Sequence, residues 1–190
     1  DLRMPGLDGM GLLDKIMEIN LVTGKKLIEA GADIIWAGDD FGSQSGIIMD
    51  PETWRKHFKP RIKIIFEEFR KVNPDIKIAW HTCGSIVPFI PDFIGIGLDI
   101  LNPLQPLAFG MNPENLVDQF GKDLIFFGGI DIQELLPNGP VQKIKDEVRR
   151  RIDLFGKYRG YICAPAHNIQ PDTPLENIMA LFETVLEYRY

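Results

Sequence analysis

The sequence predicts an α/β fold, a barrel of parallel strands with its helices on the outside. Short apolar segments alternate with longer segments of helical periodicity along the whole chain. No Gly-x-Gly-x-x-Gly turn opens a helix, so the dinucleotide-binding form of a doubly wound sheet lacks its fingerprint. Polar clusters follow directly after the apolar segments, where a barrel gathers the loops of its active site.

The first helix is predicted over residues 8–30, because Leu12, Ile16 and Ile19 recur at roughly helical spacing. Gly31 follows it, where a C-terminal cap is expected, and Gly24 predicts a break within the helix. Residues 32–37 come next, and they are short, apolar and bounded by glycine. This pattern is typical of a buried parallel strand.

The same unit then repeats to the end of the chain. Helices are predicted over residues 51–71, 87–96, 113–120, 141–155 and 174–188. Strands are predicted over residues 76–80, 98–101, 123–127 and 160–163. Pro174 suits the first turn of the last helix, so we expect Thr173 to be its N-cap. The alternation implies right-handed crossovers between parallel strands.

The composition of the chain argues against several classes of partner and against a disulfide. The chain has 190 residues, 27 acidic and 21 basic, for a net charge of -6, which argues against a nucleic-acid partner. No apolar run approaches the roughly 20 residues of a membrane span. Cys83 and Cys163 are better explained as free thiols or metal ligands than as a disulfide. We expect a cytoplasmic protein without a membrane partner.

The most specific motif is His81-Thr82-Cys83-Gly84, at the end of a predicted strand. Alternate residues of a strand point to the same side, so the imidazole and the thiol can both face the barrel mouth. Zinc accepts nitrogen and sulfur ligands. His167, in the loop after the last strand, is the easier third ligand, and Cys163 inside that strand is the alternative. A competing interpretation has His81 capping the strand and Cys83 buried.

Other polar residues also follow strands. Asp39 and Asp40 form a carboxylate pair suited to acid–base chemistry or to binding a cation, unless they belong to a solvated loop. Asp131 follows Gly128 and Gly129, where a ligand can approach the backbone or the chain can make a tight turn. The remaining candidates, as substrate contacts, are Asn102, Gln105, Gln133 and Asn168.

Taken together, these residues resemble the uroporphyrinogen decarboxylase superfamily, and specifically its cobalamin-linked methyltransferase branch. The resemblance runs from about residue 12 to residue 190 and rests on residues 31–35, 81–84, 128–131 and 170–177. The last stretch, Gln-Pro-Asp-Thr-Pro-Leu-Glu-Asn, is rather specific. The family fold is a (β/α)8 TIM barrel, and the resemblance implies that this chain supplies strands four to eight. We therefore expect a single domain over residues 1–190 that is the C-terminal portion of such a barrel.

A second resemblance covers only residues 1–9, which look like the phosphorylation-site stretch of response-regulator receiver domains. Nine residues do not make a domain, and the acidic pair that would bind magnesium is missing. We interpret this stretch as fortuitous and treat residues 1–10 as extraneous to the domain.

In the methyltransferase branch, zinc is held by the His-x-Cys pair and by a cysteine before the last helix. The resemblance implies that His81 and Cys83 are ligands and that His167 replaces the third, cysteine ligand. One thiolate fewer changes the charge and the reactivity of the site. The decarboxylase branch is cofactor-free and lacks the His-x-Cys pair, but it carries Gly-His where this chain has Ala166-His167.

The resemblance implies a zinc-dependent methyltransferase that moves a methyl group from a corrinoid on a partner protein to a small-molecule thiol. Two alternatives remain open at this point. One is a metal-free uroporphyrinogen decarboxylase, in which a carboxylate such as Asp40 stabilises the pyrrole cation. The other is a non-enzymatic barrel segment that folds only as a homodimer or with its missing half.

Overall fold

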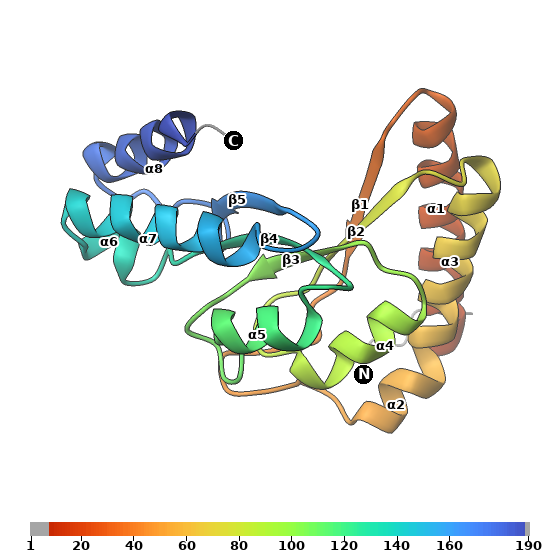
Figure 1. The fold of residues 1–190 in the computed structure, drawn as a ribbon. Helices are drawn as coiled ribbons and strands as arrows, with labels where there is room; N and C mark the ends of the chain where they lie inside the picture. The colour runs from red at the N-terminus through yellow and green to blue at the C-terminus, as the bar shows by residue number, and fades with distance from the viewer. Residues whose placement is uncertain (1–7, 189–190) are drawn as a thin grey trace.

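A five-stranded parallel sheet forms the centre of the protein in the computed structural model, which describes residues 8–188 (Figure 1). The strands lie side by side in sequence order: β1 (Ile34–Gly38), β2 (Lys77–His81), β3 (Ile100–Leu104), β4 (Ile125–Ile130) and β5 (Tyr161–Pro165). A doubly wound sheet would reverse its strand order at a switch point. The uninterrupted order confirms the prediction of a barrel-type α/β fold.

The helices connect the strands and cover one face of the sheet (Figure 1). Their bounds are α1 (Gly9–Glu29), α2 (Pro51–His57), α3 (Lys59–Val72), η1 (Val87–Phe89), α4 (Ile90–Gly95), α5 (Pro113–Phe120), α6 (Leu135–Asn138), α7 (Val141–Phe155) and α8 (Leu175–Glu187). Helices α1 and α3 lie together along one end of the sheet, whereas α7 and α8 lie together at the other. Among the described residues, no helix has the length and apolar character to cross a bilayer.

The two faces of the sheet differ in burial. Ile35, Ile78 and Leu101 face the helices and are buried in the main hydrophobic core. Register places Trp36 beside Ala79 on the opposite face, where the Trp36 side chain remains 60% exposed. In a barrel this opposite face is the interior. It also carries the polar residues described below.

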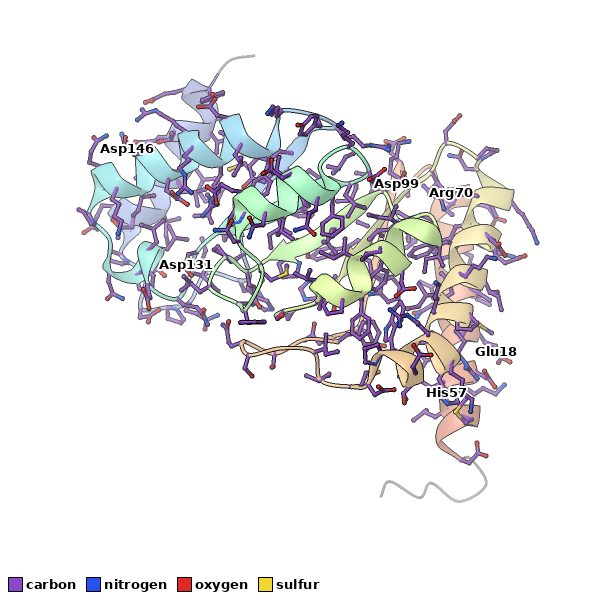
Figure 2. The ribbon with its side chains drawn as sticks, turned by 60° about the horizontal axis from the view of Figure 1, so that its bottom comes forward. Glu18, His57, Arg70, Asp99, Asp131 and Asp146 are labelled. Atoms are coloured by element: carbon purple, nitrogen blue, oxygen red, sulfur yellow. The ribbon has the colours of Figure 1, made fainter. Side chains whose placement is uncertain are left out.

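An ion pair braces the end of the sheet at which the strands begin. Arg70 of α3 donates to the carboxylate of Asp99 at 2.9 Å and to the carbonyl of Gly97 at 2.6 Å (Figure 2). The same Asp99 carboxylate accepts the N–H of Ile78 at 2.9 Å. These bonds fix the starts of β2 and β3 relative to each other. The register of the two strands then pairs His81 with Asn102 near their other ends.

Several element boundaries differ from the sequence prediction. The predicted break at Gly24 is wrong, because α1 is continuous and Gly24 is buried against Phe69 of α3. A Cβ at Gly24 would lie 2.2 Å from the Phe69 ring, so the glycine serves close helix packing. The predicted helix over residues 51–71 divides at Phe58 into α2 and α3. The predicted helix over residues 87–96 begins as the 3-10 turn η1.

One of the two alternatives for Gly128 and Gly129, the tight turn, is wrong, and so is the predicted cap of the last helix. Gly128 and Gly129 do not form a tight turn; they lie inside β4, at φ values of 108° and 90°. Thr173 does not cap α8, whose N-cap is Pro174 with no side-chain bond. The Thr173 hydroxyl is buried without a hydrogen-bond partner among the described residues. Residues 1–7 of the receiver-like stretch lie outside the described residues.

Candidate metal centre

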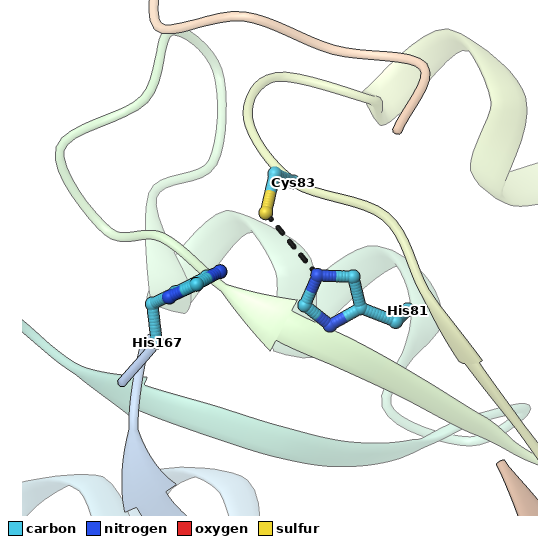
Figure 3. A group of neighbouring side chains, drawn as sticks. All are labelled: His81, Cys83 and His167. Atoms are coloured by element: carbon cyan, nitrogen blue, oxygen red, sulfur yellow. Dashed lines mark hydrogen bonds between the residues drawn. The ribbon is translucent and has the colours of Figure 1, made fainter. Parts of the chain in front are cut away.

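Three side chains with metal-binding chemistry meet where β2 and β5 end (Figure 3). His81 is the last residue of β2, Cys83 follows two residues later, and His167 lies two residues beyond β5. One ligand atom from each lies within 4.8 Å of the other two. Cys83 Sγ lies 3.3 Å from His81 Nε2, and the two imidazole centroids are 5.7 Å apart. The structure therefore brings together the three residues that the sequence put forward as ligands.

Cys163 does not join this group. It packs with Tyr161 against the smaller hydrophobic cluster formed by β4, α6, α7 and α8, on the helix-covered side of the sheet. Burial raises the pKa of its thiol, although a hydrogen bond from Tyr161 acts in the opposite direction. The alternative third ligand thus faces away from His81 and Cys83.

Asp40 lies beside the cluster and affects Cys83 directly. Its Oδ1 accepts the backbone N–H of Cys83 at 2.8 Å and lies 3.8 Å from His81 Nε2. Burial, then the negative charge of Asp40 and a hydrogen bond to it, together raise the pKa of the Cys83 thiol to about 12. Burial and the charge of Asp40 also raise the pKa of Asp39. This negative potential favours a bound cation.

The loop that carries Cys83 is fixed by its neighbours. Thr82 is fully buried, and its hydroxyl accepts the N–H of Phe41 at 3.1 Å. Gln105 accepts the N–H of Gly84 at 2.6 Å. Gly84 has a φ of 76°, and a Cβ there would lie 2.6 Å from the Ser43 backbone, so glycine is required. Gln105, predicted as a substrate contact, therefore braces the ligand loop.

Asp131 and Gln133 hold the loop after β4 and lie outside the metal cluster. The Asp131 carboxylate is 8% exposed and accepts the N–H groups of Gln133, Glu134 and Leu135 at 3.1, 2.9 and 2.8 Å. The Gln133 side chain accepts a bond of 2.8 Å from Gln44. These contacts give Asp131 a structural role as the cap of its turn.

A cavity of about 390 Å³ adjoins the cluster and is lined by both histidines, Asn102 and Asn168. Its aromatic wall consists of Trp36 and Phe127, whose rings lie 6.0 Å apart, and the Trp36 ring lies 5.9 Å from that of His81. Sequence reasoning missed Trp36, Phe127 and Thr82. Successive residues of a strand point to opposite faces, so Trp36 lies on the face opposite to the buried Ile35. This alternation is the sequence signal that could have identified Trp36 as part of the wall.

Comparison with known proteins gives a consistent assignment. The sequence pattern of the uroporphyrinogen decarboxylase (URO-D) family matches residues 10–188. A methylcobamide:CoM methyltransferase of Methanosarcina barkeri is 28% identical over 176 residues, which are 93% of this chain and 48% of the relative. A uroporphyrinogen decarboxylase of Thermus thermophilus is 28% identical over 184 residues, covering 93% of this chain and 48% of the relative.

Solved structures agree on the fold. A methyltransferase from Methanosarcina mazei superposes with a TM-score of 0.71 at 27% identity, over 92% of this chain and 48% of that one. A dihydropteroate synthase from Anaplasma phagocytophilum superposes with a TM-score of 0.61 at 15% identity, over 96% of this chain and 70% of that one. The second likeness concerns the fold alone. The chain spans about half the length of the curated relatives it matches.

Proposed function

Because this chain belongs to the uroporphyrinogen decarboxylase family, we propose that it contributes to zinc-dependent transfer of a methyl group from a corrinoid to a thiol. The observation that carries the proposal is the cluster of His81, Cys83 and His167 at the carboxyl ends of parallel strands. Catalytic sites of barrel proteins lie at this end of the sheet. The methylcobamide:CoM methyltransferase relative supports the corrinoid donor and the thiol acceptor.

The donor set fits zinc. Two imidazole nitrogens and one thiol sulfur are ordinary zinc ligands, and catalytic zinc keeps its fourth position open. The 3.3 Å between Cys83 Sγ and His81 Nε2 is compatible with two ligands of one ion whose bonds are about 2.0–2.3 Å long. The carboxylate of Asp40 adds a negative charge beside them. His81, Cys83 and His167 would therefore hold the ion.

The chemistry that the metal would supply is activation of a thiol, since a bound cation lowers the pKa of a coordinated thiol. The protein's own residues do the positioning. Asp40 and Gln105 fix the backbone on either side of Cys83. Trp36 and Phe127 form an aromatic wall of the adjoining cavity, against which the acceptor can lie.

Decarboxylation is the second candidate, because uroporphyrinogen decarboxylases are among the relatives at similar identity. The presence of Cys83 between two histidines favours methyl transfer, since a cofactor-free decarboxylase has no use for this donor set. The two functions differ in a measurable way. Methyl transfer requires the metal, whereas decarboxylation survives its removal.

The experiment compares the intact protein with two matched variants, Cys83→Ser and Cys163→Ser. Zinc content is measured, and methyl transfer from methylcobalamin to 2-mercaptoethanesulfonate is followed by the absorbance change of the corrinoid. We expect Cys83→Ser to lose zinc and activity, Cys163→Ser to keep both, and chelation of the native protein to abolish activity until zinc is returned. Activity that survives exhaustive chelation, or zinc retained in full by Cys83→Ser, would contradict the proposal.

A further inference from the structure

Asn102 lies next to His81 across the sheet, where register pairs the two residues of β3 and β2. It is 5% exposed, so its amide must find its hydrogen-bond partners within the protein. Sequence reasoning assigned it to substrate binding. The contacts of its side chain point to a different role.

The two ends of the Asn102 amide have different partners. The Nδ2 group donates to the carbonyl oxygen of Phe127 at 3.4 Å, which turns Oδ1 toward His81. Oδ1 lies 2.7 Å from His81 Nδ1. Because an amide oxygen can only accept, the hydrogen of this bond belongs to His81 Nδ1.

A neutral imidazole with its hydrogen on Nδ1 has its lone pair on Nε2. That nitrogen faces Cys83, with Sγ at 3.3 Å. The backbone of Asn102 reinforces this arrangement, since its carbonyl oxygen accepts the N–H of Thr82 at 2.7 Å. One residue thus orients both the imidazole of His81 and the start of the loop that carries Cys83.

We propose that Asn102 is a positioning residue that holds His81 in its Nδ1–H tautomer and thereby presents the Nε2 lone pair to a divalent metal. The inference rests on the proposed function for the identity of that metal. Histidine ligands are commonly fixed by an acceptor on their second nitrogen, and loss of such an acceptor typically lowers metal affinity about 10- to 100-fold.

The first test needs no metal. Long-range ¹H–¹⁵N correlation of the metal-free protein at a mildly alkaline pH reports which nitrogen of His81 carries the hydrogen. We expect Nδ1–H in the native protein and in Asn102→Asp, which keeps an acceptor. Asn102→Leu has a similar volume but no acceptor, and we expect His81 to shift toward Nε2–H or to a tautomeric mixture.

The second test measures zinc affinity by competition with a chromophoric chelator. We expect Asn102→Leu to bind zinc about 10- to 100-fold more weakly than the native protein and Asn102→Asp to recover most of this loss. Asn115→Leu removes an exposed amide of α5 outside the site and serves as the control for the loss of an asparagine. Circular dichroism and thermal melting verify that each variant is folded.

The outcomes separate the two proposals. Nε2–H in the native protein, or an unchanged tautomer and unchanged zinc affinity in a folded Asn102→Leu, would overturn the role of Asn102. If Asn102→Leu does not fold, the tautomer of His81 in the native protein still tests the role of Asn102. A native protein that shows Nδ1–H but binds no zinc would refute the proposed function and leave the effect of Asn102 on His81 standing.

Discussion

Cys83 shows how the surroundings of one residue set its chemistry. Because burial and, to a smaller extent, Asp40 together raise its pKa to about 12, the thiol keeps its proton at neutral pH in the metal-free protein. A cysteine that binds zinc must be a thiolate, so the proposed binding of zinc would release that proton and would become stronger as the pH rises. The same negative potential that disfavours a free thiolate favours the cation.

The contribution of Asp40 can be tested on the metal-free protein in a Cys163→Ser background, where Cys83 is the remaining thiol. Asp40→Asn removes the negative charge and lowers the pKa of Cys83, but burial keeps it above the ordinary 9.0. The measurement is the rate of alkylation by iodoacetamide as a function of pH. Well below both pKa values, the rate should rise about tenfold for each unit by which the pKa falls. A profile identical to that of the parent would show that Asp40 has no effect on the thiol.

Among the helices and strands, the bounds that depend on neighbouring residues in the sequence were predicted best. Helix α5 was predicted exactly, because Pro113 occupies its first turn and Asn112 caps it by accepting the N–H of Asn115. The continuity of α1 could not be predicted, because it depends on the contact of Gly24 with Phe69 in another helix. The candidate site, too, has a part that local sequence predicts and a part that depends on tertiary structure. The spacing of His81 and Cys83 predicted the ligands, whereas the aromatic wall depends on strand register.

The packing of α1 on α3 gives a direct test of the Gly24 contact. Gly24→Ala places a methyl group 2.2 Å from the Phe69 ring and should destabilise the protein by about 1–3 kcal/mol through overpacking. Gly9→Ala is the matched control in the same helix, because no atom lies within 4 Å of its added Cβ. Urea denaturation of both variants measures the difference. Equal stability of the two would mean that α3 does not pack on Gly24 as described.

The same interface predicts an acid dependence. Hydrogen bonds from Lys25 and then Lys71 lower the pKa of Glu68 from 4.5 to about 2. A carboxyl group whose pKa falls on folding stabilises the protein above its unfolded pKa, and this contribution is lost as the pH falls from 4.5 toward 2. Urea denaturation of native protein and Glu68→Gln at about pH 6 and about pH 3 tests this. The variant should show the smaller acid loss, and an equal loss in both would refute the prediction.

At the scale of the whole molecule, the sheet and its helices place the candidate site at one end of the strands and apolar side chains at the two edges. Exposed apolar residues occur on β1, as Ile34 and Trp36, and on α8, as Phe182 and Leu186. Apolar surface of this kind is typical of faces that pack against further protein. That a second copy of the chain covers these exposed apolar residues stays a prediction. The three candidate ligands themselves come from β2 and from the loops that follow β2 and β5.

The most direct test of the central claim is X-ray absorption spectroscopy at the zinc edge, on protein loaded with zinc and freed of excess metal. The proposed site predicts about one zinc per chain, with one sulfur at about 2.3 Å and two imidazole nitrogens at about 2.0–2.1 Å. Cys83→Ser should lose most of the zinc, and any zinc that remains should show no sulfur neighbour. Absence of bound zinc, a shell without sulfur, or a sulfur signal that persists in Cys83→Ser would contradict the assignment of His81, Cys83 and His167 as a zinc site.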